Sequence, residues 1–387
     1  MSSIKKFEKP LGMRDTFPRI YEKIERARQI GRKVFRSRGF DFIETPTLEY
    51  YDTVGKASAI ADSYLFKLVD SQGNTLVLRP DMTTPITRVA TSKLLKEKIP
   101  LRLAYSANVF RAQQMEGGRP AEFGQMGVEI IGDKTVFADA EVLITAIQLM
   151  KEFGIESFKL TIGHAGVLHD ILNDYTDNED QRETLRNLLV ERNYVGFEEA
   201  VHEFNLPITK ANALLEFINE ATNLSSIEDM EKYVRKNDGI EYMKQLSNLL
   251  DAYNLTQYVS FDFTLSSHMS YYTGMLFEIF ASGSGFPLGN GGRYDGLLHL
   301  FGSDAGATGF SIRIDRLLEV LPKEEIEEET ICILFDDEDF IKALDLATTL
   351  REQGARVTVQ SKKGLINREA FTKQFSRVVD LSQEETQ

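Results

Sequence analysis

Cysteine and histidine are scarce in this sequence, and their scarcity excludes several kinds of site. Cys332 is the only cysteine in 387 residues, so the chain forms no internal disulfide and no cysteine metal cluster, which fits a reducing compartment. Among the histidines, His164 and His169 lie five positions apart, a spacing that suits a metal pair neither on a helix nor on a strand. We expect a structural or surface role for both, and no metal site.

Long apolar runs and an excess of basic residues are also missing. No run approaches the roughly 20 apolar residues of a membrane span, and the opening residues MSSIKKFEKPLG lack the apolar stretch of a signal peptide. The formal net charge of −14 argues against a broad nucleic-acid-binding face, although it leaves room for a local basic patch. These features predict a cytoplasmic protein that does not enter a membrane.

The chain is long enough for about two or three domains, and its composition changes twice along its length. Over residues 170–253 glycine is scarce, charge is high and helical periods dominate, which predicts an all-helical insertion. PKEEIEEET at 322–330 is typical of an acidic linker. The segments ICILF, FIKALDLATTLREQG and ARVTVQ after it predict a strand, a helix and a strand. We therefore predict a core over residues 1–321 that contains the insertion, and a small βαβ domain over residues 329–387.

The predicted core begins with a helix and two hairpins. An amphipathic helix is expected over residues 18–38, and a first hairpin over residues 64–80 has its turn at SQGN. A second helix begins after residues 81–84, with Pro85 in its first turn. Residues 101–133 predict a longer hairpin with arms LRLAYSANVFRA and EFGQMGVEIIGD and a polar tip.

The return arm of the longer hairpin carries a polar pair on one face. Gln125 and Glu129 flank Gly127, where no side chain fills the gap, and this pattern is typical of the floor of a small-ligand pocket. A solvent-facing side of an antiparallel sheet is an equally good interpretation. The opposite face is expected to enter a core through Met126, Val128 and Ile130.

The stretch LSSHMSYYTGMLFE at residues 265–278 has the alternation of a strand from Tyr271 on. Gly274 removes bulk beside Tyr272 on the same face, so a ligand has room over that ring. An ordinary core strand is the alternative. The glycine-rich run ASGSGFPLGNGGRYDGLL that follows lacks the spacing of a phosphate-binding loop, and we expect turns between strands there.

Several of these segments resemble, in order, the motifs of one enzyme family. VFRAQQMEGGRPAEFGQMGVE at 109–129 is similar to motif 2 of the class II aminoacyl-tRNA synthetases, and specifically of histidyl-tRNA synthetase. GFDFIETPTLEY at 39–50 resembles motif 1, the dimer-forming segment, and GFSIRIDRL at 309–317 resembles the motif 3 region. The other matches include histidine-specific segments of that enzyme: LVLRPDMTT at 76–84, YYTGMLFE at 271–278 and GGRYDGL at 291–297. The resemblance implies an α+β fold with an antiparallel sheet flanked by helices, dimeric through motif 1.

The positions that resemble the amino-acid pocket of this family are kept. By the resemblance, Asp81 and Thr83 face the α-amino group of a histidine ligand, and Gln125 assists them. The chemistry agrees with this assignment, because a carboxylate attracts an ammonium group and charge-assisted hydrogen bonds are among the strongest available.

The same resemblance assigns the imidazole ring to Glu129 and Tyr272, with Tyr294 closing the pocket. A glutamate can accept a hydrogen bond from an imidazole N–H. A site that uses both ring nitrogens rejects isosteres, because a wrong ligand leaves buried polar groups unpaired. We therefore expect L-histidine as an effector bound in this pocket.

The positions that would activate an amino acid with ATP are altered. Arg111 and Arg316 resemble the arginines of motifs 2 and 3 and are kept. Ser267 stands where the family has a further catalytic arginine, and Gln113 replaces the motif 2 glutamate. Arg313 occupies the place of a glycine that lies close to ATP, and its side chain would fill that space. Loss of one such donor costs about 10²–10³ in rate, so we expect a vestigial nucleotide site and no cofactor.

This sequence combines a kept amino-acid pocket with an altered ATP site. It also has a shorter tail, residues 329–387, in place of the anticodon-binding domain of the family. This combination resembles the histidyl-tRNA synthetase-like regulatory subunits of ATP phosphoribosyltransferase, the first enzyme of histidine biosynthesis. The resemblance implies no catalytic activity in this chain, a short-form catalytic subunit as partner, feedback regulation by histidine and no tRNA binding. A working histidyl-tRNA synthetase-like adenylating enzyme is the alternative, since Arg111 and Arg316 are kept.

Overall fold

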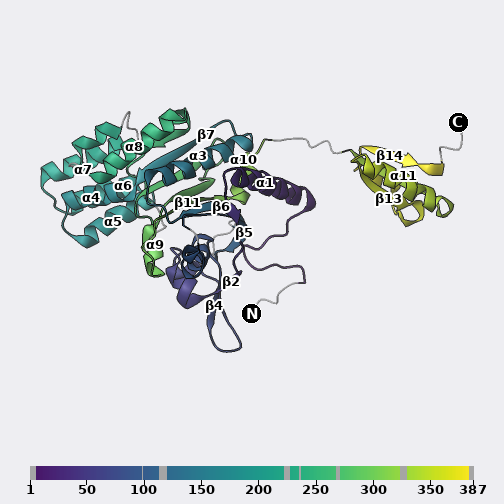
Figure 1. Ribbon diagram of the computed structural model, residues 1–387, viewed down its shortest axis with the longest axis horizontal. Coiled ribbons are helices and arrows are strands. Elements are labelled where there is room, and N and C mark those ends of the chain that lie inside the picture. Colours follow the sequence, from purple (N-terminus) through teal and green to yellow (C-terminus); the bar gives the residue numbers. More distant parts are fainter. Residues whose placement is uncertain are drawn as a thin grey trace. The chain divides into compact units, whose positions relative to one another are not determined.

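The chain folds into two compact units, Met1–Pro322 and Lys323–Gln387, shown in sequence colours in Figure 1. The structure, a computed structural model, describes residues 6–97, 99–112, 120–221, 227–234, 237–266, 271–322 and 329–382. None of the described helices combines the length and the apolar character that a membrane crossing requires. Within the same residues, no group of three or more His, Cys, Asp or Glu side chains is placed to hold a metal ion.

The larger unit is built on an eight-stranded sheet with the order β1-β5-β6-β11-β10-β9-β7-β8. Neighbouring strands are antiparallel except at the two ends, where β1 pairs with β5 and β7 with β8 in parallel. The predicted antiparallel sheet flanked by helices is thereby confirmed. The strands are β1 (Asp41–Phe42), β5 (Leu101–Phe110), β6 (Glu122–Ile131), β7 (Phe158–His164), β8 (Val259–Phe261), β9 (Met275–Ala281), β10 (Gly289–Arg293) and β11 (Ala307–Arg313).

Helices cover both faces of this sheet and bury its central strands on both sides. One face is covered by α1 (Pro18–Ser37), α3 (Val136–Glu152) and α10 (Ile314–Val320). The other face is covered by α2 (Thr83–Ser92) and α9 (Asp295–Leu300). The first helix and the second helix therefore lie where the apolar periods and Pro85 predicted them.

The two faces of β6 enter two different cores. Met126, Val128 and Ile130 pack on the α1 and α3 side, as predicted. Gln125 and Glu129 belong to the face that α2 and α9 cover, and Glu129 is 1% exposed. The solvent-facing interpretation of this polar pair is therefore wrong.

β10 lies within the glycine-rich run that the sequence predicted as turns, so that prediction is only partly right. Residues 282–288 do connect two strands, but Gly289–Arg293 is a strand itself. Gly291 pairs with Phe277 on one side and with Phe310 on the other. A Cβ at Gly291 would lie 2.4 Å from the backbone oxygen of Gly309, so the close approach of these strands requires glycine.

A second, three-stranded antiparallel sheet has the order β2-β4-β3. It consists of β2 (Leu48–Tyr50), β3 (Lys67–Val69) and β4 (Thr75–Leu78), and β3 with β4 forms the predicted first hairpin. Tyr50 and Leu68 lie on either side of Leu76 and share its face. Leu48, Tyr50 and Leu68 are 45%, 53% and 43% exposed, so this sheet presents an uncovered apolar face.

The chain leaves the central sheet after β7, forms a run of helices and returns to the sheet at β8. Figure 1 shows these helices gathered together at one end of the sheet. They are α4 (Ala165–Tyr175), α5 (Glu179–Val190), α6 (Tyr194–Glu203), α7 (Ile208–Ala221) and α8 (Asp238–Ala252), and we call them the helical segment. α8 packs against α3 and so connects the helical segment to the core.

The smaller unit is a parallel sheet with the order β13-β12-β14. Its elements are β12 (Thr330–Phe335), α11 (Phe340–Glu352), β13 (Arg356–Ser361), α12 (Arg368–Thr372) and β14 (Arg377–Asp380). Ile331 and Ile333 of β12 pack against Ala343 and Ala347 of α11. β14 was not predicted, because only Val379 of its residues is buried and so short a strand leaves almost no apolar pattern.

Candidate functional site

A small cavity opens on the α2 side of the central sheet, and the structure brings all six predicted pocket residues to it. Its volume is ≈ 20 Å³, so a ligand much larger than water requires its walls to move apart. The predicted residues that line it are Asp81, Thr83, Gln125, Glu129, Tyr272 and Tyr294. Asp81 precedes α2 and Thr83 begins it, whereas Gln125 and Glu129 belong to β6. Tyr272 lies before β9, and Tyr294 follows β10.

Glu129 lies at the centre of this cavity. Its Oε1 accepts a hydrogen bond from Thr83 Oγ1 at 2.9 Å, and its Oε2 accepts one from the Tyr294 hydroxyl at 2.7 Å. Burial raises the pKa of Glu129 to about 8, although the two hydrogen bonds act in the opposite direction. The carboxyl group is therefore mostly protonated at neutral pH and can serve as a donor as well as an acceptor.

Asp81 is held at the start of α2. Its Oδ1 accepts a hydrogen bond from the backbone N–H of Thr84 at 2.8 Å, as an acidic residue before a helix commonly does. Its Oδ2 accepts a hydrogen bond from Ser58 Oγ at 2.7 Å. These contacts fix a buried carboxylate beside Thr83, whose hydroxyl already contacts Glu129. One helix start thus supplies two polar groups to the cavity.

The gap at Gly127 is not empty. Tyr105 of β5 pairs with Gly127 across the hairpin, and a Cβ at this glycine would lie 2.7 Å from the Tyr105 hydroxyl oxygen. The predicted ligand space over Gly127 is therefore wrong, because the Tyr105 ring occupies it and the hydroxyl end lines the cavity instead. Sequence reasoning missed Tyr105, although matching residue 101 with 131 across the hairpin places it opposite Gly127.

The space at Gly274 is also filled. β9 begins at Met275, so the strand predicted from Tyr271 starts four residues later. A Cβ at Gly274 would lie 3.2 Å from Arg293 Cδ, which means that this glycine makes room for Arg293 and not for a ligand over Tyr272. The Tyr272 hydroxyl accepts a hydrogen bond from Asn290 Nδ2 at 3.2 Å, and Asn290 is a second lining residue that the sequence did not reveal.

Two arginines lie over Phe123 at the predicted nucleotide site, and Arg316 is close enough to both to be affected by their charge. The guanidinium carbon of Arg313 lies 3.7 Å from the centre of the Phe123 ring, and that of Arg111 lies 5.4 Å from it. Arg313 also forms an ion pair with Asp315 at 2.6 Å. Burial, together with repulsion from Arg313 and Arg111, lowers the pKa of Arg316 to about 10. Gln113 and Ser267, the other two predicted positions, lie outside the described residues.

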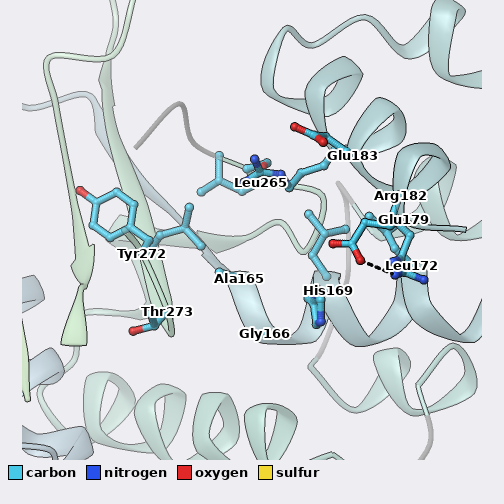
Figure 2. Close-up of a pocket in the computed structure, with 14 residues that line it drawn as sticks. Ala165, Gly166, His169, Leu172, Glu179, Arg182, Glu183, Leu265, Tyr272 and Thr273 are labelled. Atoms are coloured by element: carbon cyan, nitrogen blue, oxygen red, sulfur yellow. Dashed lines mark hydrogen bonds and ion pairs between the residues drawn. The ribbon is translucent and has the colours of Figure 1, made fainter. Parts of the chain in front are cut away.

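A larger cavity of ≈ 560 Å³ lies on the other side of Tyr272, between α4, α5 and the start of β9. Figure 2 shows Tyr272 and Thr273 on one side of it and Glu179, Arg182 and Glu183 of α5 on the other. Arg182 and Glu179 form an ion pair at 3.4 Å. Tyr272 lines both cavities and is the one predicted site residue among the described lining of the larger one.

Two family models match the chain, one for each unit. The model described as "Histidyl-tRNA synthetase" matches residues 12–317. The model described as "Histidyl-tRNA synthetase HisZ, C-terminal domain" matches residues 332–382. Together they cover the central sheet with its cavity and the small parallel sheet.

Named relatives match over almost the whole length. An "ATP phosphoribosyltransferase regulatory subunit" of Lysinibacillus sphaericus is 66% identical over 380 residues, which are 98% of this chain and 99% of the relative. A crystal structure described as an "ATP phosphoribosyltransferase regulatory subunit/histidyl-tRNA synthetase" from Bacillus halodurans covers 98% of this chain and 99% of its own, with a TM-score of 0.90 at 43% identity. Histidyl-tRNA synthetase from Nostoc sp. PCC 7120 covers 96% and 90%, with a TM-score of 0.79, and its 17% identity shows a shared fold alone.

Proposed function

Because the chain belongs to the family of ATP phosphoribosyltransferase regulatory subunits, we propose that it binds a catalytic ATP phosphoribosyltransferase chain and controls it. A regulatory subunit of this enzyme acts in histidine biosynthesis and has a role other than catalysis. In our proposal the phosphoribosyl transfer takes place in a short-form partner, which needs this chain for activity. We place the complex in the cytoplasm and expect no tRNA partner.

The proposed effector is L-histidine, bound in the small cavity. One observation carries this proposal: the buried carboxyl group of Glu129, with its pKa near 8, faces Thr83 and Tyr294 beside a second carboxylate, Asp81. An ammonium group suits Asp81, and an imidazole can accept a proton or a hydrogen bond from Glu129 or donate to it. Histidine would favour one state of the assembly and so lower the activity of the partner.

Arg313 is one of the residues that support the proposed absence of adenylation. Its guanidinium group packs on Phe123 and pairs with Asp315. By the family resemblance Arg313 stands in place of a glycine that lies close to ATP, and in our proposal its side chain fills that space. Arg111 and Arg316 are present in the same region and favour the alternative, a working adenylating enzyme. Histidine-dependent exchange of pyrophosphate into ATP distinguishes the two, because it requires adenylation and a regulatory subunit should give no signal.

We also propose that the chain pairs with a second copy of itself through the motif 1 region. The apolar face of the β2-β4-β3 sheet supports this proposal, since Leu48, Tyr50 and Leu68 form a patch that a soluble monomer rarely leaves uncovered. Residues 1–321 would then be the dimer-forming core, with the predicted helical insertion at 170–253 inside it and residues 329–387 as a separate domain.

The decisive experiment reconstitutes the complex. A short-form ATP phosphoribosyltransferase chain is assayed alone, with this chain, and with this chain plus histidine. We expect low activity alone, high activity in the mixture and inhibition by histidine. A partner that is equally active without this chain would contradict the regulatory proposal. If calorimetry detects no histidine binding at millimolar concentration, the proposal that histidine is the effector is wrong.

A further inference from the structure

A buried polar network includes Arg293, the residue that precedes Tyr294 of the small cavity. Asp139 of α3 has a fully buried side chain, and its Oδ2 accepts a hydrogen bond from Arg293 Nε at 3.0 Å. The same oxygen accepts a hydrogen bond from the Tyr242 hydroxyl of α8. A buried carboxylate is costly unless it is paired and hydrogen-bonded, so the contacts with Tyr242 and Arg293 help to hold Asp139 in place. Tyr242 brings the helical segment into this network.

Arg293 ties this network to several other parts of the core. Its Nη1 donates to the backbone oxygen of Asp133 at 3.1 Å and to Asp295 Oδ1 at 3.3 Å, and its Nη2 donates to the backbone oxygen of Thr135 at 3.2 Å. The ion pair with Asp295 is thus one contact of several. A planar guanidinium group with this many acceptors has little freedom to move.

Two of the tyrosines that line the small cavity, Tyr272 and Tyr294, are attached to this arginine. Tyr294 follows Arg293 in the chain and lies between it and Asp295, whose side chain Arg293 contacts. On the other side, the backbone N–H of Thr273 donates to the backbone oxygen of Arg293 at 2.9 Å, directly after Tyr272. Gly274 completes the contact, because its missing side chain lets the Arg293 stem pack against the backbone.

We propose that Tyr242 is a positioning residue for the ligand pocket: its hydroxyl, through Asp139 and Arg293, sets the positions of Tyr272 and Tyr294 and so couples the pocket to the helical segment. A ligand that moves these tyrosines then changes the contact of α8 with the core. A partner bound to the helical segment then changes the affinity of the pocket for its ligand by the same factor as the ligand changes the affinity for the partner, because such coupling is reciprocal. The coupling itself does not depend on the ligand, but its regulatory meaning rests on the proposed histidine site.

Tyr242→Phe tests the proposal with little other disturbance. The phenylalanine keeps the ring, which packs edge-on against His164 at a centroid distance of 6.1 Å, and removes only the hydroxyl. Tyr253→Phe is the matched control, since Tyr253 directly follows α8 and is largely exposed. Both variants are made in the full-length protein.

The first readout is amide hydrogen exchange without any ligand. The N–H groups of Thr273 and Tyr294 donate to Arg293 and Ala307, and we expect both to exchange about fivefold faster in Tyr242→Phe, as the loss of one buried hydrogen bond implies. Amides of β6 should keep their rates, and Tyr253→Phe should match the natural protein. Unchanged rates at Thr273 and Tyr294 overturn the proposal, and so does a uniform rise across the unit, which indicates a structural role alone.

The second readout is calorimetry with histidine. Tyr242→Phe should bind histidine about fivefold more weakly, while Tyr253→Phe binds it as the natural protein does. Equal affinity in the three proteins overturns the coupling. If the natural protein binds no histidine, the proposed effector function fails, and the exchange experiment still decides the position of the two tyrosines.

Discussion

Gly309 of β11 pairs with Glu129 of β6, and a Cβ at this glycine would stand 1.9 Å from Glu129 Oε2. It would also stand 2.3 Å from the backbone oxygen of Val128. The carboxyl group at the centre of the cavity therefore occupies the volume that any other residue at 309 would need.

Gly309→Ala should displace Glu129 and strain the pairing of β6 with β11. We expect a loss of about 3 kcal/mol in the free energy of unfolding, as for an overpacked core position, and no measurable histidine binding. Denaturant unfolding and calorimetry measure the two effects. Gly285→Ala is the control, because a Cβ at Gly285 meets no atom within 4 Å. Full histidine affinity in Gly309→Ala would contradict the placement of the ligand beside Glu129.

The raised pKa of Glu129 predicts a pH dependence of stability. The folded protein holds this proton up to about pH 8, whereas an unfolded glutamate releases it near its ordinary value of 4.5. Between these values the folded state binds more protons than the unfolded state, so the free energy of unfolding falls as pH rises, by up to about 1.4 kcal/mol per pH unit. Below the window this group contributes no dependence.

Glu129→Gln isolates this contribution. Burial also raises the pKa values of Asp139 and Glu278, which give the same sign, so the natural protein and the variant must be compared across the window. We expect the variant to lose stability less steeply between pH 5 and about pH 8 when chemical unfolding is followed. Glu122→Gln, at the exposed end of the same strand, should follow the natural protein. Parallel curves for Glu129→Gln and the natural protein would be the contrary result.

The sequence was sufficient to predict the features that depend on local pattern and on the order of the motifs. The helix at Thr83–Ser92, the hairpin of β5 and β6 and the family itself are confirmed. The six pocket residues were chosen by motif resemblance, and the cavity gathers them, although their role in binding stays a prediction.

The features that were missed depend on side chains meeting across strands. Gly127 and Gly274 were correctly singled out as positions without bulk, but the atoms that use this space belong to Tyr105 and Arg293. A sequence shows that a position is small and does not show which distant side chain fills it. Asn290 was missed for the same reason, because its partner Tyr272 lies on a different segment.

Arg313→Gly should reopen the predicted nucleotide site. The change removes the side chain from Phe123 and from Asp315, and the lost ion pair is partly exposed and worth less than about 1 kcal/mol. We expect ATP binding to appear in calorimetry, without pyrophosphate exchange, since Gln113 and Ser267 still replace catalytic groups of the family. Arg313→Lys keeps a long cation there and should not bind ATP. Equal ATP binding by all three proteins would show that Arg313 does not block the site.

Tyr50→Glu should separate the proposed dimer. A buried, unpaired carboxylate in the middle of the apolar face formed with Leu48 and Leu68 costs several kcal/mol of association, whereas the same charge in water costs little. Sedimentation velocity of the natural protein should give a dimer and that of the variant a monomer, with similar thermal stability of the monomer fold. Tyr253→Glu places the same charge at another exposed tyrosine and should remain dimeric. A Tyr50→Glu protein that sediments with the natural one would move the dimer contact away from the β2-β4-β3 sheet.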